Sequence, residues 1–425
     1  MLDIKEIRKD PKGIETRLRT KEPALTLSSV LELDERVRRI LTEAEELQAT
    51  RNQLSKDIGE RRRKGEESAS QLIEVSGMGE RIAALEQELS GLKEKLQEAL
   101  SSLPNLPDES VKISLNKEDN VCLKSVGERP SFSFPIRSHL ELGEGLALFD
   151  FERGAKLAGS GWPLYRGRGA RLEWALLNYM LDIHEENGFE QWMVPLLVKK
   201  EILYGSGQLP KFADQSFKLD DAHFPFYLIP TAEVVLNGVH FDEILNADDL
   251  PLKYAAYTPC FRREAGAAGR QERGLIRTHQ FNKVEMFAFS APETSEELFR
   301  EMIASAEKIL SGLNLHYRLM QLVTADTSFA ATKTVDVEVW LPSQERYYEV
   351  SSISHCSDFQ ARRSKIRFRK RGGKPELVHT LNGSGLATSR LMIALLESNQ
   401  RPDGSVSLPL VLHHYLKGMK ELNIR

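Results

Sequence analysis

Apolar residues recur at alternating steps of four and three along two stretches near the start of the chain. This spacing is a heptad seam, which is typical of α-helices that pack against one another as a coiled coil. The seam positions are Leu33, Val37, Ile40, Ala44, Leu47, Arg51, Leu54 and Ile58 in the first stretch, and Leu72, Val75, Met78, Ile82, Leu85, Leu89, Leu92 and Leu96 in the second. A polar turn at residues 64–67 joins the two stretches. The pattern therefore predicts an antiparallel hairpin of two helices, each of about 35 residues and about 50 Å long.

The pattern changes at residues 101–108, where Pro104 and Pro107 stand among polar residues. Prolines in such a setting end a helix and separate structural units. Beyond them, strand-like and helical patterns mix with glycine-rich turns, without internal repeats. We therefore expect an α+β fold built around an antiparallel sheet. The expected organisation is a helical arm at 1–103, a linker at 104–115 and a main domain at 116–425.

A β-hairpin is predicted around a glycine-rich, basic loop at residues 265–274. Its first strand ends at Phe261, and its second strand begins at Phe281. An arginine can bind a phosphate through its forked guanidinium, an aromatic ring can stack on a base, and a carboxylate can accept a hydrogen bond from an exocyclic amine. The residues that could do so are Arg262, Glu264, Arg277 and Phe281. An ordinary hairpin held by an Arg–Glu ion pair is the alternative for any one such pair.

Two further segments carry recognisable patterns. An amphipathic helix predicted at 172–187 leads into 188–197, which has the pattern of a strand with a proline. An interior strand with an edge proline is the alternative there.

Near the C-terminus, glycines at 380–390 precede an apolar helix at 391–397. Glycines allow a ligand to approach closely, and Arg390 could reach a phosphate. A glycine-rich turn capping a core helix is the alternative.

Composition excludes several classes of protein. The 425 residues carry a net charge of −4, so nucleic-acid contacts must come from local patches. Cys122, Cys260 and Cys356 are far apart in the sequence, which excludes a disulfide framework and a zinc knuckle. No run of about eighteen apolar residues occurs, so we expect a soluble, cytoplasmic protein without contact to a membrane. Phosphate-binding patterns of the P-loop and dinucleotide types are missing, so a nucleotide would have to be held by the hairpin.

Positive charge gathers in two places. One is the end of the predicted arm, where Asp57 and Glu60 are the only acids among the basic residues Arg51, Lys56, Arg61, Arg62, Arg63 and Lys64. Such a cluster is either a solvated helix end or a surface that contacts nucleic-acid phosphates. The other is 361–374, with eight basic residues and no acid. It is either a charged, protected sheet edge or a second surface for nucleic acid.

Taken together, these segments resemble a known enzyme family. The pattern FRxE, loop, RxxxF resembles the second signature motif of class II aminoacyl-tRNA synthetases, and 188–197 and 380–390 resemble the first and third motifs. The N-terminal hairpin, the Thr-Ala-Glu at 231–233 and the Glu-Val-Ser-Ser at 349–352 resemble seryl-tRNA synthetases. The resemblance covers essentially the whole chain, and the motifs of class I synthetases are absent.

The resemblance implies a reaction and its partners. L-Serine would be activated with ATP to seryl-adenylate and then transferred to the 3′ end of tRNA(Ser), and also of tRNA(Sec). ATP would act with Mg²⁺ and without zinc, the basic end of the arm would bind tRNA, and the first motif would build a homodimer. A polar pocket suits serine because buried donors and acceptors reject ligands that leave them unpaired.

The resemblance also assigns residues to each step. Arg262 and Arg390 are the expected catalytic residues. Serine would be bound by Thr231, Ala232, Glu233, Arg262, Glu285 and Ser384. ATP would be bound by Arg262, Arg263, Glu264, Thr278, Phe281, Glu349, Val350, Ser351, Ser352 and Arg390, with Glu349 and Ser352 holding Mg²⁺.

Two other functions remain open on the sequence. A different class II synthetase, for proline or threonine, could use the same sheet, although the N-terminal hairpin argues against it. A non-catalytic relative could bind RNA or modify a carrier protein. The presence of Arg262, Glu264, Glu349 and Arg390 argues against the loss of ATP chemistry.

Overall fold

The computed structural model describes residues 1–65, 67–264 and 273–424 and divides the chain into two compact units. One unit is Leu2–Pro104, and the other is Asn105–Arg425 together with Met1. We call the second unit the body. Most of the predicted hairpin loop at 265–274 lies outside the described residues, as does Glu66 in the predicted turn of the arm.

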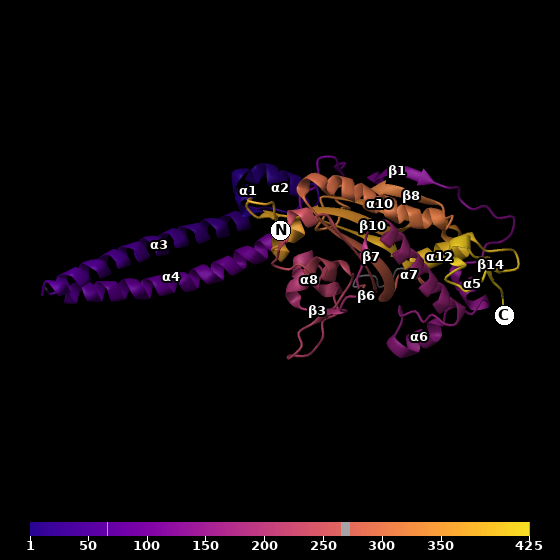
Figure 1. Ribbon diagram of the computed structural model, residues 1–425, viewed down its shortest axis with the longest axis horizontal. Helices are drawn as coiled ribbons and strands as arrows, with labels where there is room; N and C mark the ends of the chain where they lie inside the picture. Colours follow the sequence, from indigo (N-terminus) through magenta and orange to yellow (C-terminus); the bar gives the residue numbers. More distant parts are fainter. Residues whose placement is uncertain (66, 265–272, 425) are drawn as a thin grey trace. The chain divides into compact units, whose positions relative to one another are not determined.

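The first unit is entirely helical. Its helices are α1 (Ile4–Lys9), α2 (Pro11–Arg19), α3 (Ser28–Arg63) and α4 (Ala69–Ser101). Helices α3 and α4, which we call the arm, lie side by side and antiparallel along their length (Figure 1). This arrangement confirms the predicted helical hairpin.

The seam of the arm is buried most completely at the end near α1 and α2. Val37 and Ile40 of α3 and Leu85, Leu89 and Leu92 of α4 are all less than 10% exposed. Toward the other end burial is less complete, since Leu72 is 40% exposed although Ile58 is buried. The heptad pattern did not predict that Asp34 would also be buried. Its carboxylate is neutralised by Arg38 at 3.0 Å and Arg8 at 3.4 Å.

The body is built on an eight-stranded sheet of order β1-β8-β9-β10-β13-β7-β6-β2. The pairs are antiparallel except β2 with β6, which is parallel. Its strands are β1 (Val121–Val126), β2 (Glu190–Gln191), β6 (Leu252–Phe261), β7 (Gln280–Ser290), β8 (Tyr317–Gln321), β9 (Lys333–Leu341), β10 (Arg346–Ser357) and β13 (His379–Ala387). The expected α+β fold around an antiparallel sheet is confirmed.

Helices cover one face of this sheet. The main core joins the strands to α7 (Arg168–Glu186), α10 (Ser295–Gly312) and α12 (Thr388–Ser398) (Figure 1). Strand β7 shows how the two faces differ, because its alternate residues Val284, Met286 and Ala288 point into this core. Residues Lys283 and Glu285, at the intervening positions, therefore face the other side of the sheet.

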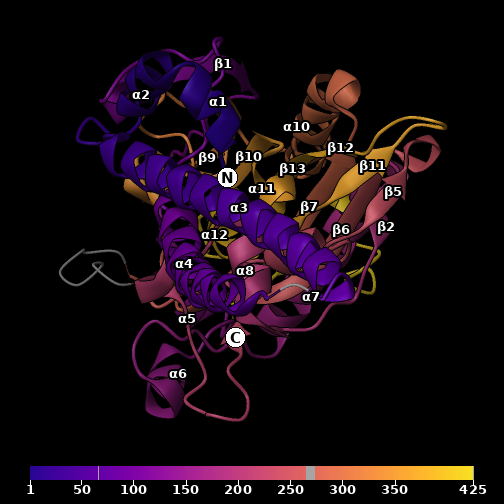
Figure 2. The same ribbon diagram turned by 90° about the vertical axis from the view of Figure 1, so that its left-hand side faces the viewer.

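The second face is only partly covered. Helix α9 (Glu233–Gly238) and a small sheet of order β12-β11-β5 pack there, through Leu236 and Phe368 against Phe287 and Phe289. Figure 2 shows the three strands of the small sheet together. The other elements of the body are α5 (His139–Gly145), α6 (Phe151–Ala158), α8 (Lys200–Ser206), α11 (Phe359–Ser364), β3 (Leu197–Val198), β4 (Tyr227–Leu228), β5 (Ile244–Asn246), β11 (Arg367–Arg369), β12 (Glu376–Leu377), β14 (Val406–Ser407) and β15 (Glu421–Leu422). The uncovered part of this face holds the polar residues described next. None of the helices among the described residues has the length and apolar character needed to span a membrane.

Candidate active site

Two neighbouring cavities open on the second face of the sheet. The first cavity has a volume of about 310 Å³ and the second about 320 Å³. Strands β7, β10 and β13 contribute to both, because polar residues on these strands alternate with core residues and so reach the same face, and Arg262 directly follows the end of β6. Arg262, Lys283, Glu349 and Ser384 line both cavities. The two cavities therefore meet at a group of charged and polar side chains.

The first cavity brings together most of the residues predicted to bind serine. Its lining includes Thr231, Glu233, Arg262, Glu285 and Ser384. Ala232 is fully buried and packs in the hydrophobic cluster with α9 instead.

A tight polar network forms the floor of the first cavity. Thr231 Oγ1 donates to Glu285 Oε2 at 2.9 Å and accepts from Lys283 Nζ at 2.8 Å. Lys283 and Glu285 also form an ion pair, and both are buried. Since each charge is compensated by the other, the network can hold a small polar ligand without leaving an unpaired buried charge.

Glu233 has an unusual protonation equilibrium. Burial, and next the negative charge of Glu285, raise the pKa of its carboxyl to about 7. Gln360 Nε2 donates to Glu233 Oε1 at 2.7 Å and so fixes the orientation of the carboxyl group. A carboxyl group in this position would be stabilised as a carboxylate by a positively charged ligand group.

The second cavity contains most of the residues predicted to bind ATP, whereas Ser352 lines only the first cavity. Its lining includes Glu264, Thr278, Phe281, Val350 and Arg390. The guanidinium of Arg262 lies 5.1 Å from the ring centre of Phe281, and its Nε donates to the carbonyl of Pro230 at 3.4 Å. The ion pair at the base of the hairpin joins Glu264 to Arg277 at 2.5 Å, and not to Arg262.

Two predicted ATP residues lie outside the lining of the cavities. Arg263 is exposed after the end of β6, and its amide donates to the carbonyl of Gln215. Ser351 is buried, and its Oγ donates to the carbonyl of Ser384 at 2.5 Å. Ser351 is thus placed to hold β10 against β13.

Arg390 lies near the start of α12 and points to the second cavity. Its Nη1 donates to the carbonyl of Glu349 at 2.8 Å, and its Nε donates to the carbonyl of Ile276 at 3.3 Å. The helix begins at Thr388, three residues before the predicted start. These two bonds hold the guanidinium between β10 and the segment around Ile276 that precedes β7.

The glycines before α12 lie in strand β13 and not in a turn. The side chains of Ile353 and His184 lie closest to the positions that Cβ atoms at Gly383 and Gly385 would take. A Cβ atom at Gly385 would lie 2.0 Å from His184 Nε2. Burial lowers the pKa of His184 to about 4, so the neutral ring can donate from Nε2 to the carbonyl of Gly385 at 2.5 Å. The glycine is therefore needed for close packing of β13 against α7.

Oxygen atoms suited to a divalent cation gather where the cavities meet. Glu349 and Ser352 both line the first cavity, and Asp336 lies directly opposite Ser352 in the β9–β10 pair. One carboxylate oxygen of Asp336 is buried without a hydrogen-bond partner among the described residues. Burial, and next the charge of Glu349, raise the pKa of Asp336 well above its usual value. A hard cation such as Mg²⁺ would fit this donor set.

Sequence reasoning missed three residues of the site, namely Lys283, Asn382 and Asp336. Lys283 stands two positions from both Phe281 and Glu285, and Asn382 stands two positions before Ser384. The two-residue period of a strand could have identified both. Asp336 could not have been found in this way, because it reaches the site through pairing between strands.

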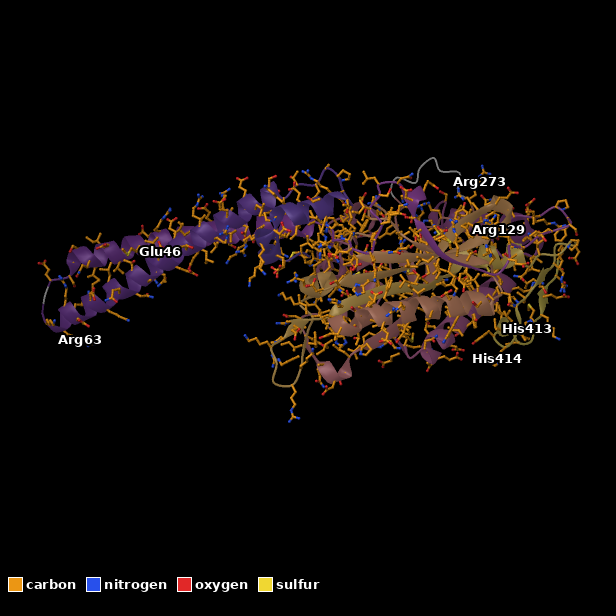
Figure 3. The ribbon with its side chains drawn as sticks, turned by 90° about the horizontal axis from the view of Figure 1, so that it is seen from above. Glu46, Arg63, Arg129, Arg273, His413 and His414 are labelled. Atoms are coloured by element: carbon orange, nitrogen blue, oxygen red, sulfur yellow. The ribbon has the colours of Figure 1, made fainter. Side chains whose placement is uncertain are left out.

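The basic clusters lie on the surface. At the end of the arm Lys56, Arg61, Arg62, Arg63 and Lys64 are exposed, and Arg51 is partly buried. Figure 3 shows Arg63 at this end of α3. In the stretch 361–374, Arg363 is buried, and Asp358, Asp242 and Glu293 form ion pairs with Arg362, Arg367 and Lys370 respectively. Part of that stretch is therefore neutralised within the body.

Comparisons with known proteins identify relatives along the whole chain. The family "Seryl-tRNA synthetase N-terminal domain" matches residues 1–107, and the family "tRNA synthetase class II core domain (G, H, P, S and T)" matches residues 217–399. The serine–tRNA ligase of Chlamydia abortus is 52% identical over 422 residues, which cover 99% of this chain and 100% of that protein. The crystal structure of seryl-tRNA synthetase from Pyrococcus horikoshii complexed with ATP aligns with a TM-score of 0.94, at 37% identity and with 100% of both chains covered. The cytoplasmic serine–tRNA ligase of Naegleria fowleri in complex with AMP aligns with a TM-score of 0.87, at 26% identity, over 100% of this chain and 99% of that chain.

Proposed function

Since the chain belongs to the seryl-tRNA synthetase family and is an ATP-dependent serine–tRNA ligase, we propose how its two cavities share the reaction. The first cavity binds serine, the second binds ATP, and Arg262 acts on both ligands where the cavities meet. The observation that carries this proposal is that Arg262 lines both cavities.

The first half-reaction needs no protein nucleophile. An oxygen of the serine carboxylate attacks the α-phosphorus of ATP, the bond to the β-phosphate breaks, and pyrophosphate leaves. The guanidinium of Arg262 neutralises charge on both the carboxylate and the α-phosphate and holds them in line. In the second half-reaction, a hydroxyl of the 3′-terminal adenosine of tRNA attacks the seryl carbonyl, and AMP leaves.

Serine is selected by the polar floor of the first cavity. Thr231 and Glu233 bind the ammonium group, and Glu285 and Ser384 bind the hydroxyl. Alanine leaves the buried polar groups unpaired, and the additional methyl group of threonine meets the wall of the cavity. The network between Thr231, Lys283 and Glu285 supports this assignment, because it holds the carboxylate of Glu285 in one orientation.

The second cavity binds ATP through its base and its phosphates. Phe281 stacks on the adenine, Glu264 accepts from the adenine amine, and Arg390 binds the γ-phosphate. The lining of this cavity is completed by Thr278 and Val350. Behind the lining, the cavity is supported by Arg263 and Ser351. Glu349 and Ser352 hold the Mg²⁺ that accompanies ATP, and this ion supplies neutralisation of phosphate charge.

We further propose the partners of the enzyme. The arm binds tRNA(Ser), and also tRNA(Sec), through Arg51, Lys56, Arg61, Arg62, Arg63 and Lys64. The protein acts in the cytoplasm as a homodimer. Trp174 of α7 is 55% exposed, and Met193, in the segment that resembles the first motif, is fully exposed. Large exposed apolar side chains of this kind support a surface that a second copy covers.

Exchange of pyrophosphate with ATP, measured over a panel of amino acids, tests the proposed function. Exchange should depend on serine and should be absent with proline and threonine. Exchange with another amino acid, or with none, would contradict it. Aminoacylation of separate tRNA(Ser) and tRNA(Sec) transcripts then decides whether both are substrates.

We expect Glu285→Ala to impair the use of serine more than the binding of ATP. The substitution removes the acceptor for the serine hydroxyl and leaves Lys283 buried without its ion-pair partner. The KM for serine should rise by about tenfold or more, and alanine or threonine should compete better. Glu285→Gln keeps the shape of the cavity and serves as the control for folding. If the KM for ATP rises instead while amino-acid preference is unchanged, Glu285 belongs to the nucleotide site.

The raised pKa of Glu233 predicts a pH dependence of serine binding. Below about pH 7 the carboxyl group is protonated, so binding of the serine ammonium must first displace a proton. The KM for serine should therefore fall as pH rises from about 5.5 to about 8, by up to about tenfold per pH unit below the pKa. The KM for ATP is the internal control and should not follow this curve. Glu233→Gln should raise the KM for serine and remove its pH dependence, and a retained dependence would assign the titration to another group.

A further inference from the structure

A buried carboxylate that neither cavity uses lies on α7. Glu173 is 4% exposed, and Leu172 and Leu176, its neighbours on α7, belong to the main core. One of its oxygens, Oε1, accepts two hydrogen bonds. Thr388 Oγ1 donates to it at 2.5 Å, and Asn282 Nδ2 donates to it at 2.7 Å.

Both donors belong to elements that form the second cavity. Thr388 is the first residue of α12, two positions before Arg390, and Asn282 follows Phe281 on β7. Thr388 Oγ1 also lies 3.1 Å from the carbonyl oxygen of Asn282. The hydroxyl of Tyr257, on β6, donates to Asn282 Oδ1 at 3.2 Å. The network therefore ties α7 and α12 to β6 and β7, which lie together in the body (Figure 1).

This arrangement is not the one that stability alone would favour. A carboxylate in an apolar core is destabilising unless hydrogen bonds satisfy all of its oxygens. The second oxygen of Glu173, Oε2, is buried without a hydrogen-bond partner among the described residues. An apolar residue of similar size would fill the space between α7 and α12 without that penalty. Buried polar groups that lack a hydrogen bond are expected where a residue serves a functional site.

We propose that Glu173 is a positioning residue for ATP binding. It fixes the first turn of α12 against β7, and so sets the distance between the guanidinium of Arg390 and the ring of Phe281. The inference rests on the proposed roles of Arg390 and Phe281 at the two ends of ATP. Small displacements of such groups are costly, because the phosphate chain and the base must be held at the same time.

Three variants test this proposal in the pyrophosphate-exchange assay. Glu173→Ala removes the shared acceptor and should raise the KM for ATP by about tenfold, with the KM for serine changed by less than about twofold. Glu173→Gln should restore the KM for ATP to within about threefold of the wild-type value, because its amide oxygen still accepts from both donors. Thr388→Val keeps the shape of the residue but removes its hydroxyl, and should raise the KM for ATP as Glu173→Ala does. Glu186→Ala, an exposed glutamate of α7, is the matched control and should leave both values unchanged.

The outcomes distinguish a failure of the role proposed for Glu173 from a failure of the role proposed for Arg390. Arg390→Ala is measured in the same assay, and an unchanged KM for ATP would overturn the role of Arg390 itself. If Arg390→Ala raises that KM while Glu173→Ala and Thr388→Val do not, the role of Glu173 alone is overturned. Equal rises in both KM values, or a Glu173→Gln variant as impaired as Glu173→Ala, would also overturn it. Should Glu173→Ala fail to fold, Thr388→Val and Glu173→Gln still test whether Glu173 positions α12 for ATP binding.

Discussion

Arg262→Ala should lower the rate of adenylate formation by about 10² to 10³-fold, the effect of removing one preorganised charge contact from a transition state. The guanidinium lies where the two cavities meet, so its loss leaves charge on the serine carboxylate and the α-phosphate uncompensated. The loss should appear mainly in kcat of pyrophosphate exchange. Arg262→Lys should recover only part of the rate, because a lysine provides a charge without the forked geometry.

Folding should be nearly unaffected by this substitution. Arg262 is only partly buried, and its hydrogen bond to Pro230 is long, at 3.4 Å. Arg369→Ala, which changes an exposed arginine of β11 outside both cavities, is the matched control. A well-folded Arg262→Ala protein that exchanges pyrophosphate at the wild-type rate would exclude Arg262 from the chemical step.

Deletion of the arm, residues 28–100, should separate the two half-reactions. Every residue that lines the two cavities lies beyond residue 200, and the main core of the body is formed by residues 142–422. Adenylate formation should therefore persist. Transfer of serine to tRNA should fall steeply, and the loss should be smaller at low salt, where the remaining phosphate contacts bind more strongly. If deletion abolishes pyrophosphate exchange in a protein that folds, the arm contributes to the chemistry as well.

A milder change tests the end of the arm alone. Replacing Arg61, Arg62 and Arg63 with alanine should weaken tRNA binding and reduce the slope of log affinity against log salt by up to about three. Lys93→Ala with Lys95→Ala, at exposed positions near the other end of α4, is the control within the same helical hairpin. An unchanged slope in the arginine variant would show that these residues form only a solvated helix end.

Some features of this fold are encoded by residues that are close in the sequence, and others are not. Heptad spacing was sufficient to predict the two helices of the arm, and the hairpin motif was sufficient to predict β6 and β7. The sequence did not show that Glu264 pairs with Arg277 across the hairpin, or that Gly385 makes room for His184. Both depend on groups that come together only in the folded body. Asp336 was missed for the same reason, since only the pairing of β9 with β10 places it opposite Ser352.

The uneven burial along the arm has a consequence for its motions. Apolar burial provides most of the stability of such a helical pair. The seam is closed around Ile40 and Leu89, whereas near the arginines Ile58 is buried but Leu54 and Val75 are only partly buried and Leu72 is exposed. The free energy needed to open the helices locally must therefore decrease toward the end that carries the arginines. At that end, α3 and α4 can separate and pair again while the rest of the two helices stays paired. The arm is therefore stiff at the end near α1 and α2 and more flexible at the end that carries the arginines. Its positive charges can adjust to the shape of an RNA without unfolding of the whole arm.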